Sequence, residues 1–483
     1  MKDVKFEPVI GLEIHLQLHT KSKMFCSCAV SDGDAPPNSN ICPICTGQPG
    51  VLPALNAQSV TLAIKSAVAL NCKINTTSIF ARKNYFYPDC PKNYQITQHE
   101  RPLAEGGFIE IETGAISKRI DLERIHTEED AGKSIHDAAG KNQDYSLVDF
   151  NRSGTPLIEI VTKPEMNSPQ EAYDFLTALK SIMQWSEISN CDMEKGNLRV
   201  DVNLSLRPKG DKKLGTKVEM KNLNSFKAVK DCLNFEIKRQ TTEIKEGRRI
   251  IQETRLWNEA KNSTVTMRSK EESHDYRYFP EPDLAPLQIS VKTINEIKKS
   301  LPELPAQRKQ RFIKEYKLSD YDGRVLTSDK NLADYFESAV KSSKASPKLI
   351  SNWITTDLAG KLKAERKDIT NSPIASKHIA ELVSLIELGK ISTKMAKEVF
   401  LKMWETEAHP QEIVSQGNMS QVSDQNQLES WAKEAIASNP SAAKDLKNGK
   451  EKAIGALVGF VMKKSKGKAN PAVLNKIIKK LVS

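Results

Sequence analysis

The chain has 483 residues, of which 39% are hydrophobic and 28% are charged, and its formal net charge is +11. This length is too great for one hydrophobic core, so we expect two to four domains of an ordinary water-soluble protein. No run of about 18 apolar residues is present, and MKDVKFEPVI lacks the apolar segment of a signal peptide, which together exclude a membrane partner and predict a cytosolic location.

The first predicted element is the segment VIGLEIHLQLH, residues 9–19. Apolar and polar residues alternate along it, which predicts a strand with one buried face. Glu13, His15 and Gln17 occupy the other face. Water, a metal ion or a phosphate would each be a suitable neighbour for these side chains.

Four of the eight cysteines follow this strand, in the spacing C-x-C, thirteen residues, C-x-x-C. The intervening Gly, Pro, Asn and Ser residues indicate a loop, so two thiolate pairs can meet at one point. This pattern predicts a structural zinc site formed by Cys26, Cys28, Cys42 and Cys45. Four free cysteines in a turn-rich segment are the alternative. The other four cysteines are scattered along the chain.

Residues up to about 286 are rich in predicted strands that are separated by turns. Three helical patterns interrupt them, at residues 57–70, 168–187 and 225–245. Further strands are predicted at residues 107–113, 118–130, 156–163, 197–208 and 215–223. This order favours an α+β fold with a mixed, largely antiparallel sheet.

The remaining sequence is predicted to be helical. Helices are expected near residues 305–316, 330–345, 348–365, 375–388 and 393–405, followed by short amphipathic helices. We therefore predict three domains: a cradle-like catalytic domain over residues 1–295, a helical domain over 296–407 and a small helical tail over 408–483.

Acidic residues gather in two of the predicted strands. RIHTEEDAGKS contains GKS but has Thr127 where a phosphate-binding P-loop needs glycine, so a P-loop is excluded. Glu128 and Glu129 lie in this segment, and Glu159 lies between apolar residues in PLIEIVTK. Each carboxylate either faces solvent or binds a partner. With Glu13 and His15 they form a ligand set suited to magnesium.

Several long blocks resemble the B subunits of the bacterial aspartyl/glutamyl-tRNA amidotransferases. They include VIGLEIHLQL, RKNYFYPDCPKNYQITQ, HTEEDAGKS, DFNRSGTPLIEIV, NLRVDVNLSLRP, GTKVEMKNLNSF and DYRYFPEPDL, and the similarity continues to the tail. The resemblance implies a heterotrimer with a glutaminase A subunit and a small C subunit, acting on Glu-tRNA(Gln) or Asp-tRNA(Asn). It also implies phosphorylation of the mischarged side-chain carboxylate by ATP, followed by amidation with ammonia supplied by the A subunit.

The same resemblance assigns residues to roles. Glu13, His15, Glu128, Glu129 and Glu159 match the family's catalytic magnesium ligands, with the choice between Glu128 and Glu129 left open, and the four clustered cysteines match its zinc-bearing branch. Arg82, Lys83, Tyr85 and Tyr87 mix cations with aromatic rings, a combination that binds a nucleotide or a single-stranded tRNA end. Packing of these rings beneath a hairpin is the alternative.

The tail contains the basic turn KKSKGKANP between two amphipathic helices. Its lysines, Lys463, Lys464, Lys466 and Lys468, are predicted to contact the body of the tRNA, unless they only increase solubility. The competing function for the whole chain is a zinc-stapled RNA-binding scaffold without catalysis. That function leaves the acidic residues unexplained, because carboxylates repel RNA unless a cation intervenes.

Overall fold

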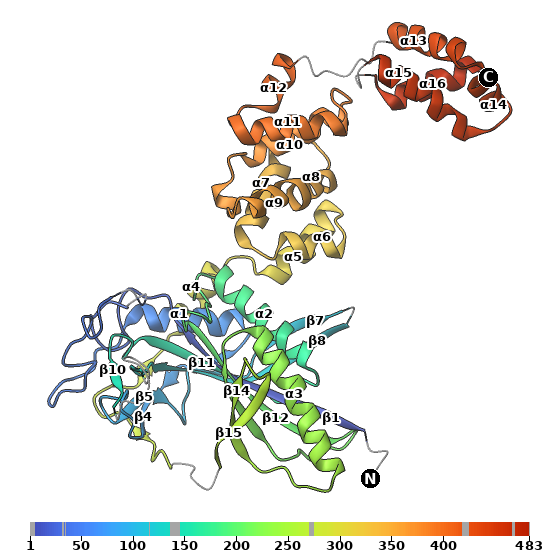
Figure 1. Cartoon of the computed structure of the whole chain (residues 1–483). Helices are drawn as coiled ribbons and strands as arrows, with labels where there is room; N and C mark the ends of the chain where they lie inside the picture. Colours follow the sequence, from blue (N-terminus) through green and yellow to red (C-terminus); the bar gives the residue numbers. More distant parts are fainter. Residues whose placement is uncertain are drawn as a thin grey trace. The chain divides into compact units, whose positions relative to one another are not determined.

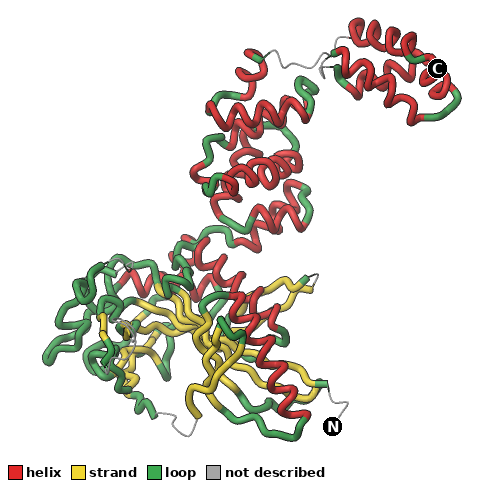
Figure 2. Tube along the Cα trace, viewed as in Figure 1, coloured by secondary structure: helices red, strands yellow, loops and turns green. Residues whose placement is uncertain are grey.

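The structure is a computed structural model that describes residues 5–30, 33, 35–114, 116–135, 145–269, 275–417, 425–465 and 469–482. The chain forms two compact units, Met1–Leu304 and Pro305–Ser483 (Figure 1). Within the described residues, strands occur in the first unit, whereas the second is helical (Figure 2). The α+β class is thereby confirmed, and the division into three domains stays a prediction.

The first unit is built on a ten-stranded sheet. Across the sheet lie β15 (Ser263–Ser269), β14 (Glu253–Asn258), β13 (Val218–Leu223), β12 (Leu198–Pro208), β1 (Phe6–Gln17), β11 (Pro156–Thr162), β8 (Ile116–Glu129), β6 (Ala104–Glu105) and β2 (Lys73–Ile74), with β7 (Phe108–Thr113) beside β8. β13 and β14 are parallel, and the other described pairs in this sheet are antiparallel. Sequence patterns did not predict β14 or β15.

Short sheets border this large sheet. One contains β16 (Phe279–Pro280), β4 (Phe80–Asn84) and β5 (Tyr94–Gln98); two others pair β9 (Lys133–Ile135) with β10 (Leu147–Asp149), and β3 (Thr77–Ser78) with β17 (Leu287–Gln288). β5 packs beside β8. It therefore contributes side chains next to the acidic end of that strand.

Helices cover the apolar face of the large sheet. These are α1 (Ala57–Ala69), α2 (Pro169–Trp185) and α3 (Phe226–Lys245), followed in the chain by α4 (Val291–Ser300) (Figure 1). Ile14 of β1, Phe175 of α2 and Leu233 of α3 are fully buried members of one hydrophobic cluster. Because this face is sealed by packing, the opposite, polar face of the central strands is the one that is free to form a site.

Each of the first three helices begins at a residue that caps it. Asn56 accepts hydrogen bonds from the backbone N–H groups of Gln58 and Ser59, and Ser168 and Ser225 each accept one from the third residue beyond. Side-chain caps of this kind satisfy donors that the first helical turn leaves unpaired. The Ser-Pro start predicted for the second helix is therefore confirmed.

The second unit consists of short helices. They are α5 (Pro305–Tyr316), α6 (Asp320–Leu326), α7 (Lys330–Ser342), α8 (Pro347–Trp353), a π-helical turn (Ile354–Leu358), α9 (Ala359–Ala364), α10 (Ser376–Glu387), α11 (Thr393–Thr406), α12 (Pro410–Gln416), α13 (Gln425–Ser438), α14 (Pro440–Lys447), α15 (Ile454–Lys464) and α16 (Pro471–Val482). The helix expected over residues 348–365 is thus a helix with a π-helical turn at its centre. The last four helices share a hydrophobic cluster that contains Leu457 and Leu474.

Glu337 on α7 forms the ion pairs that join this helix to α5. Its carboxylate lies 2.7 Å from Arg308 Nη2 and 3.0 Å from Arg311 Nη2, and its side chain is 11% exposed. Burial raises the pKa of Glu337, but hydrogen bonds from Arg311 and Lys341 outweigh it and lower the pKa to about 2. The ionised form therefore stabilises the packing of α5 against α7.

We predict that Glu337→Gln destabilises this helix pair by about 1.5–3 kcal/mol at pH 7, because charge-assisted hydrogen bonds are removed. Since folding lowers the pKa of Glu337, the stabilisation is present above its unfolded pKa, near 4.5, and is lost as the pH falls toward about 2. Hydrogen exchange of residues 305–342 in the full chain measures the effect. Exposed Glu315→Gln, the control, should change it by less than about 0.5 kcal/mol, and equal effects of the two substitutions would contradict the prediction.

Candidate functional site

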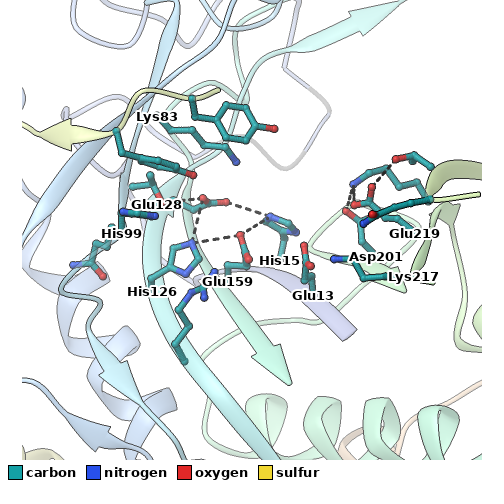
Figure 3. A pocket seen from close by; sticks show the side chains of 18 of the residues that line it. Glu13, His15, Lys83, His99, His126, Glu128, Glu159, Asp201, Lys217 and Glu219 are labelled. Carbon is teal, nitrogen blue, oxygen red and sulfur yellow. Dashed lines mark hydrogen bonds and ion pairs between the residues drawn. The ribbon is translucent and has the colours of Figure 1, made fainter. Parts of the chain in front are cut away.

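The polar face of the central strands brings together residues from three distant parts of the chain. In the antiparallel register, His15 of β1 lies opposite Glu159 of β11, and Glu159 lies opposite His126 of β8. Glu128 follows on the same face of β8, two residues beyond His126. The three strands therefore present two imidazoles and two carboxylates in one group (Figure 3).

The atoms of this four-residue cluster are close enough to share a cation. His15 Nε2 lies 3.4 Å from Glu128 Oε1 and 3.3 Å from Glu159 Oε2. His126 Nε2 lies 3.4 Å from Glu159 Oε2 and 3.7 Å from Glu128 Oε2. Ligand atoms of His15, Glu128 and Glu159 all lie within 4.8 Å of one another.

Electrostatic attraction within the cluster shifts the pKa values of its members more than their burial does, and in the opposite direction. Burial lowers the pKa of His126, but the charges of Glu159 and Glu128 raise it overall to about 9. Burial also lowers the pKa of His15, but its hydrogen bond to Glu159 and the charge of Glu128 raise that pKa overall. Both carboxylates have a lowered pKa despite burial, owing to the two histidines. His126 Nδ1 is buried and has no hydrogen-bond partner among the described residues.

This cluster lies in a cavity of about 500 Å³. Lys221 contacts Asp201 Oδ2 and lies 3.1 Å from Glu219 Oε1 on another wall, and Lys217 lines the cavity near them (Figure 3). A cavity of this size suits a small-molecule ligand. Its mixture of carboxylates and ammonium groups suits a phosphate-bearing ligand that arrives with a cation.

Aromatic rings border the same cavity. The rings of His99 and Tyr278 are stacked with centroids 4.1 Å apart, and Lys83 Nζ lies 4.8 Å from the ring centroid of Tyr276. All four residues line the cavity. Aromatic faces beside an ammonium group provide a surface on which a nucleobase can stack next to its phosphates.

The two adjacent glutamates between which the sequence did not decide lie on opposite sides of β8. Glu128 faces the cavity, where its carboxylate accepts a hydrogen bond from Thr97 Oγ1 at 3.2 Å. Glu129 accepts a hydrogen bond from the backbone N–H of Ile96 at 3.0 Å and contacts Lys92. It lines a different cavity together with Cys26 and Cys45, so the structure groups Glu128, and not Glu129, with His15 and Glu159.

Glu13 lies in the main cavity but outside the four-residue cluster. Its carboxylate accepts a hydrogen bond from Asn203 Nδ2 at 2.9 Å, and in the register it lies opposite Asp201 of β12. Glu13 therefore lines the cavity between the cluster and the lysine-bearing wall (Figure 3).

The four predicted nucleotide-binding residues point in different directions. Lys83 lines the cavity. Arg82 instead forms ion pairs with Glu281 at 2.7 Å and Asp283 at 3.1 Å. Tyr85 packs edge-on against Tyr276 with ring centroids 6.3 Å apart, and Tyr87 is 54% exposed. Both the nucleotide-binding role of these residues and the alternative, packing of the rings beneath a hairpin, stay predictions.

Sequence reasoning did not assign His126, Asp201, Lys217, Glu219 or Lys221 to the site. His126 had a signal, since it precedes Glu128 by two residues and so shares its face. Lys217, Glu219 and Lys221 alternate in the same way, with Lys217 directly before β13 and the other two within it. Which face meets the cavity depends on the pairing of β13 with β12 and of β12 with β1, and β1 is distant in sequence.

The four clustered cysteines form a second group. Their sulfur atoms lie within 4.8 Å of one another, as four ligands of one ion require. The pKa of Cys45 is lowered to about 4, chiefly by a hydrogen bond from Cys26 and with a contribution from Lys23. The pKa of Cys28 is raised to about 11, chiefly by burial. Fully buried Lys23 places its Nζ 3.5 Å from Cys45 Sγ.

In the tail, Lys463 and Lys464 end α15. Lys464 forms an ion pair with Glu434 of α13, and Lys466 and Lys468 lie outside the described residues. The two helices flanking the turn pack as predicted, with Leu457 and Val461 of α15 and Leu474 and Ile478 of α16 in one core.

Along the described residues, no helix has both the length and the apolar character needed to cross a membrane.

Two family models match the chain. The GatB/GatE catalytic domain matches residues 8–295, and the GatB domain matches residues 334–482. The B subunit of the aspartyl/glutamyl-tRNA(Asn/Gln) amidotransferase of Elusimicrobium minutum is 56% identical over 479 residues, which cover 99% of each chain. The proteins of the same name from Persephonella marina and Carboxydothermus hydrogenoformans are each 50% identical, covering 99% and 98% of this chain and 100% and 98% of theirs.

Proposed function

The chain belongs to the GatB/GatE family, and from this premise we propose that it is the amidotransferase subunit that activates a tRNA-bound side-chain carboxylate. The observation that carries the proposal is the cluster of Glu128, Glu159, His15 and His126 inside a cavity large enough for a phosphate-bearing small molecule. A scaffold that only binds RNA has no use for two buried carboxylates in its ligand cavity, so the catalytic function is favoured.

The proposed reaction has two balanced steps. A carboxylate oxygen of the mischarged Glu or Asp attacks the γ-phosphorus of ATP, and ADP leaves. Ammonia from the A subunit then attacks the carboxyl carbon of the acyl phosphate. Inorganic phosphate leaves with the carboxylate oxygen that was phosphorylated in the first step, and a proton is released. Phosphorylation is needed because a free carboxylate has no suitable leaving group.

The donor set fits a magnesium ion. Glu128 and Glu159 supply oxygen ligands, Glu13 lies nearby in the same cavity, and His15 adds an imidazole nitrogen. Magnesium at phosphoryl-transfer sites is held by one or two carboxylates, with water and phosphate oxygens as further ligands. When bound there, the ion would neutralise the charge that develops on the transferred phosphoryl group.

Other residues of the cavity bind and orient the substrates. Lys83, Lys217 and Lys221 would attract the phosphates, because each carries an ammonium group at the cavity wall. Stacked His99 and Tyr278 would hold a base of ATP or of the tRNA acceptor end. In this arrangement the phosphates lie between the lysines and the acidic cluster.

The cysteine group would hold a structural zinc ion. Four sulfur ligands complete the tetrahedron that zinc prefers, which leaves no open position for a substrate. The loops that carry the cysteines lie beside Glu129 and Lys92. Zinc would therefore stabilise the part of the first unit that supports the acidic end of β8.

The proposed assembly contains the A subunit, a small C subunit and mischarged tRNA. The names of the relatives, which specify the B subunit of an amidotransferase for aspartyl- or glutamyl-tRNA, support this assignment. The tail domain would bind the tRNA backbone through Lys463 and Lys464, while the cavity receives the aminoacylated end.

We predict that Glu159→Gln lowers amide formation by about 100-fold or more, since one ligand charge is removed while the side-chain shape is kept. Glutamine hydrolysis by the A subunit in the assembled complex should persist. Exposed Glu110→Gln on β7 is the matched control and should retain wild-type amidation. Undiminished amidation by the Glu159→Gln complex would refute the assignment.

We predict one zinc ion per chain in the cysteine group, and its loss in Cys45→Ser. Zinc should also be lost when a chelator is added to the wild-type protein. The expected result is a lower stability of the first unit, measured by proteolysis or hydrogen exchange around residues 24–50, because the loop loses its crosslink. Cys72→Ser, outside the group, is the control. Full zinc content in the Cys45→Ser protein would contradict the site.

We predict that replacing both Lys463 and Lys464 by Ala raises the KM for mischarged tRNA. The slope of log affinity against log salt should fall by about one for each phosphate that the protein no longer contacts. Lys444→Ala with Lys447→Ala, on α14 of the same group of helices, is the matched control. A KM that stays unchanged at two salt concentrations would show that the two lysines only solubilise the tail.

A further inference from the structure

A second histidine-containing cluster lies in the helical unit. His378 and Glu381 are one turn apart on α10, and His409 directly precedes α12. One ligand atom from each lies within 4.8 Å of the other two, and His409 Nδ1 is 3.7 Å from Glu381 Oε2. Neither the family resemblance nor the proposed reaction accounts for these residues.

The two imidazoles of this cluster are packed against each other. Their ring centroids are 4.2 Å apart with an interplanar angle of 56°. His378 is only 8% exposed, and its Nε2 has no hydrogen-bond partner among the described residues. An unsatisfied buried nitrogen is unfavourable by about 1–3 kcal/mol in general, so its persistence indicates that a ligand completes the group.

We propose that His378, Glu381 and His409 bind a divalent transition-metal ion, with Zn²⁺ as the best match. Two imidazole nitrogens and one carboxylate oxygen are the donors that zinc accepts. Magnesium and calcium prefer several oxygen ligands, and this group supplies only one carboxylate beside its two imidazoles. The inference is independent of the function proposed for the first unit.

Zinc binding would draw the three ligand atoms, which lie within 4.8 Å of one another, closer together. Ligands about 2 Å from a tetrahedral zinc ion lie about 3.3 Å from one another, close to the 3.7 Å between His409 and Glu381. The side chain of His409 is 47% exposed. Water can therefore reach the fourth position from this side, while buried His378 anchors the ion against the helices.

The ion would connect two helices that are separated by α11 in the chain. α12 has only seven residues, of which Pro410, Ile413 and Val414 are buried, and it packs against both α10 and α11. Ligands in the first two turns of α10 and immediately before α12 would fix the start of the short helix to the longer one. Zinc binding should therefore slow opening of α12.

The test counts zinc ions in the intact chain. Wild-type and variant proteins are stripped with a chelator, reloaded with Zn²⁺, freed of excess metal and measured by native mass spectrometry. Wild type is expected to hold one more zinc ion than Glu381→Gln and His409→Ala. Exposed Glu405→Gln on α11 is the control and should match wild type.

A second readout is local. Addition of Zn²⁺ should slow hydrogen exchange at residues 376–387 and 409–416 in wild type and in Glu405→Gln, but not in the two ligand variants. Cys45→Ser removes only the zinc ion proposed for the cysteine group. If the cysteine group binds no zinc, wild type should still hold one zinc ion more than the Glu381→Gln and His409→Ala proteins. Equal zinc counts in wild type and both ligand variants would overturn the proposal. So would hydrogen exchange at these residues that does not change in wild type when Zn²⁺ is added.

Discussion

Attraction between two buried carboxylates and two imidazoles is the interaction on which the catalytic unit depends. Glu128 and Glu159 are nearly removed from water, and isolated charges there would be strongly destabilising. His15 and His126 compensate them only because the strands hold a fixed register. A slip of one residue would turn these side chains toward the helices and the apolar residues toward the cavity.

The apolar face of the sheet secures that register. Residues such as Leu12 and Ile14 are 0–1% exposed beneath the helices, so the free energy gained by burying them opposes any slip. A site that needs sub-ångström placement of charged groups is thus built on the most tightly packed part of the unit. The polar cluster and the hydrophobic core lie on opposite faces of the same strands.

The end of β8 connects the proposed reaction site with the cysteine group. Glu128 faces the cavity, and Glu129 faces the loops of Cys26 and Cys45. Asp130, next in sequence, receives Arg199 Nη2 at 2.7 Å and Gln17 Nε2 at 3.3 Å, which join it to β12 and β1. Burial raises the pKa of Asp130, but Arg199 and its other partners lower that pKa overall. Three consecutive acids therefore fix one strand end in three directions.

The sequence predicted features that depend on local pattern. Alternation along residues 9–19 identified the polar face of β1, and cysteine spacing identified four sulfur atoms that do meet. It did not decide between Glu128 and Glu129, because alternation separates the faces without saying which one lies beside His15. Asp201 was missed for the same reason, since pairing across about 190 residues brings β12 to β1. Lys221 was missed because β13 reaches this cavity only through its pairing with β12.

The central claim is that the carboxylate of the mischarged amino acid is phosphorylated at the cluster of His15, His126, Glu128 and Glu159. Mischarged tRNA with ¹⁸O in that side-chain carboxylate, supplied to the assembled amidotransferase with ATP and glutamine, tests it directly. Mass spectrometry of the released inorganic phosphate should find one ¹⁸O atom per amide formed, and Glu159→Gln should abolish this transfer. Unlabelled phosphate released during normal amide formation would contradict the account.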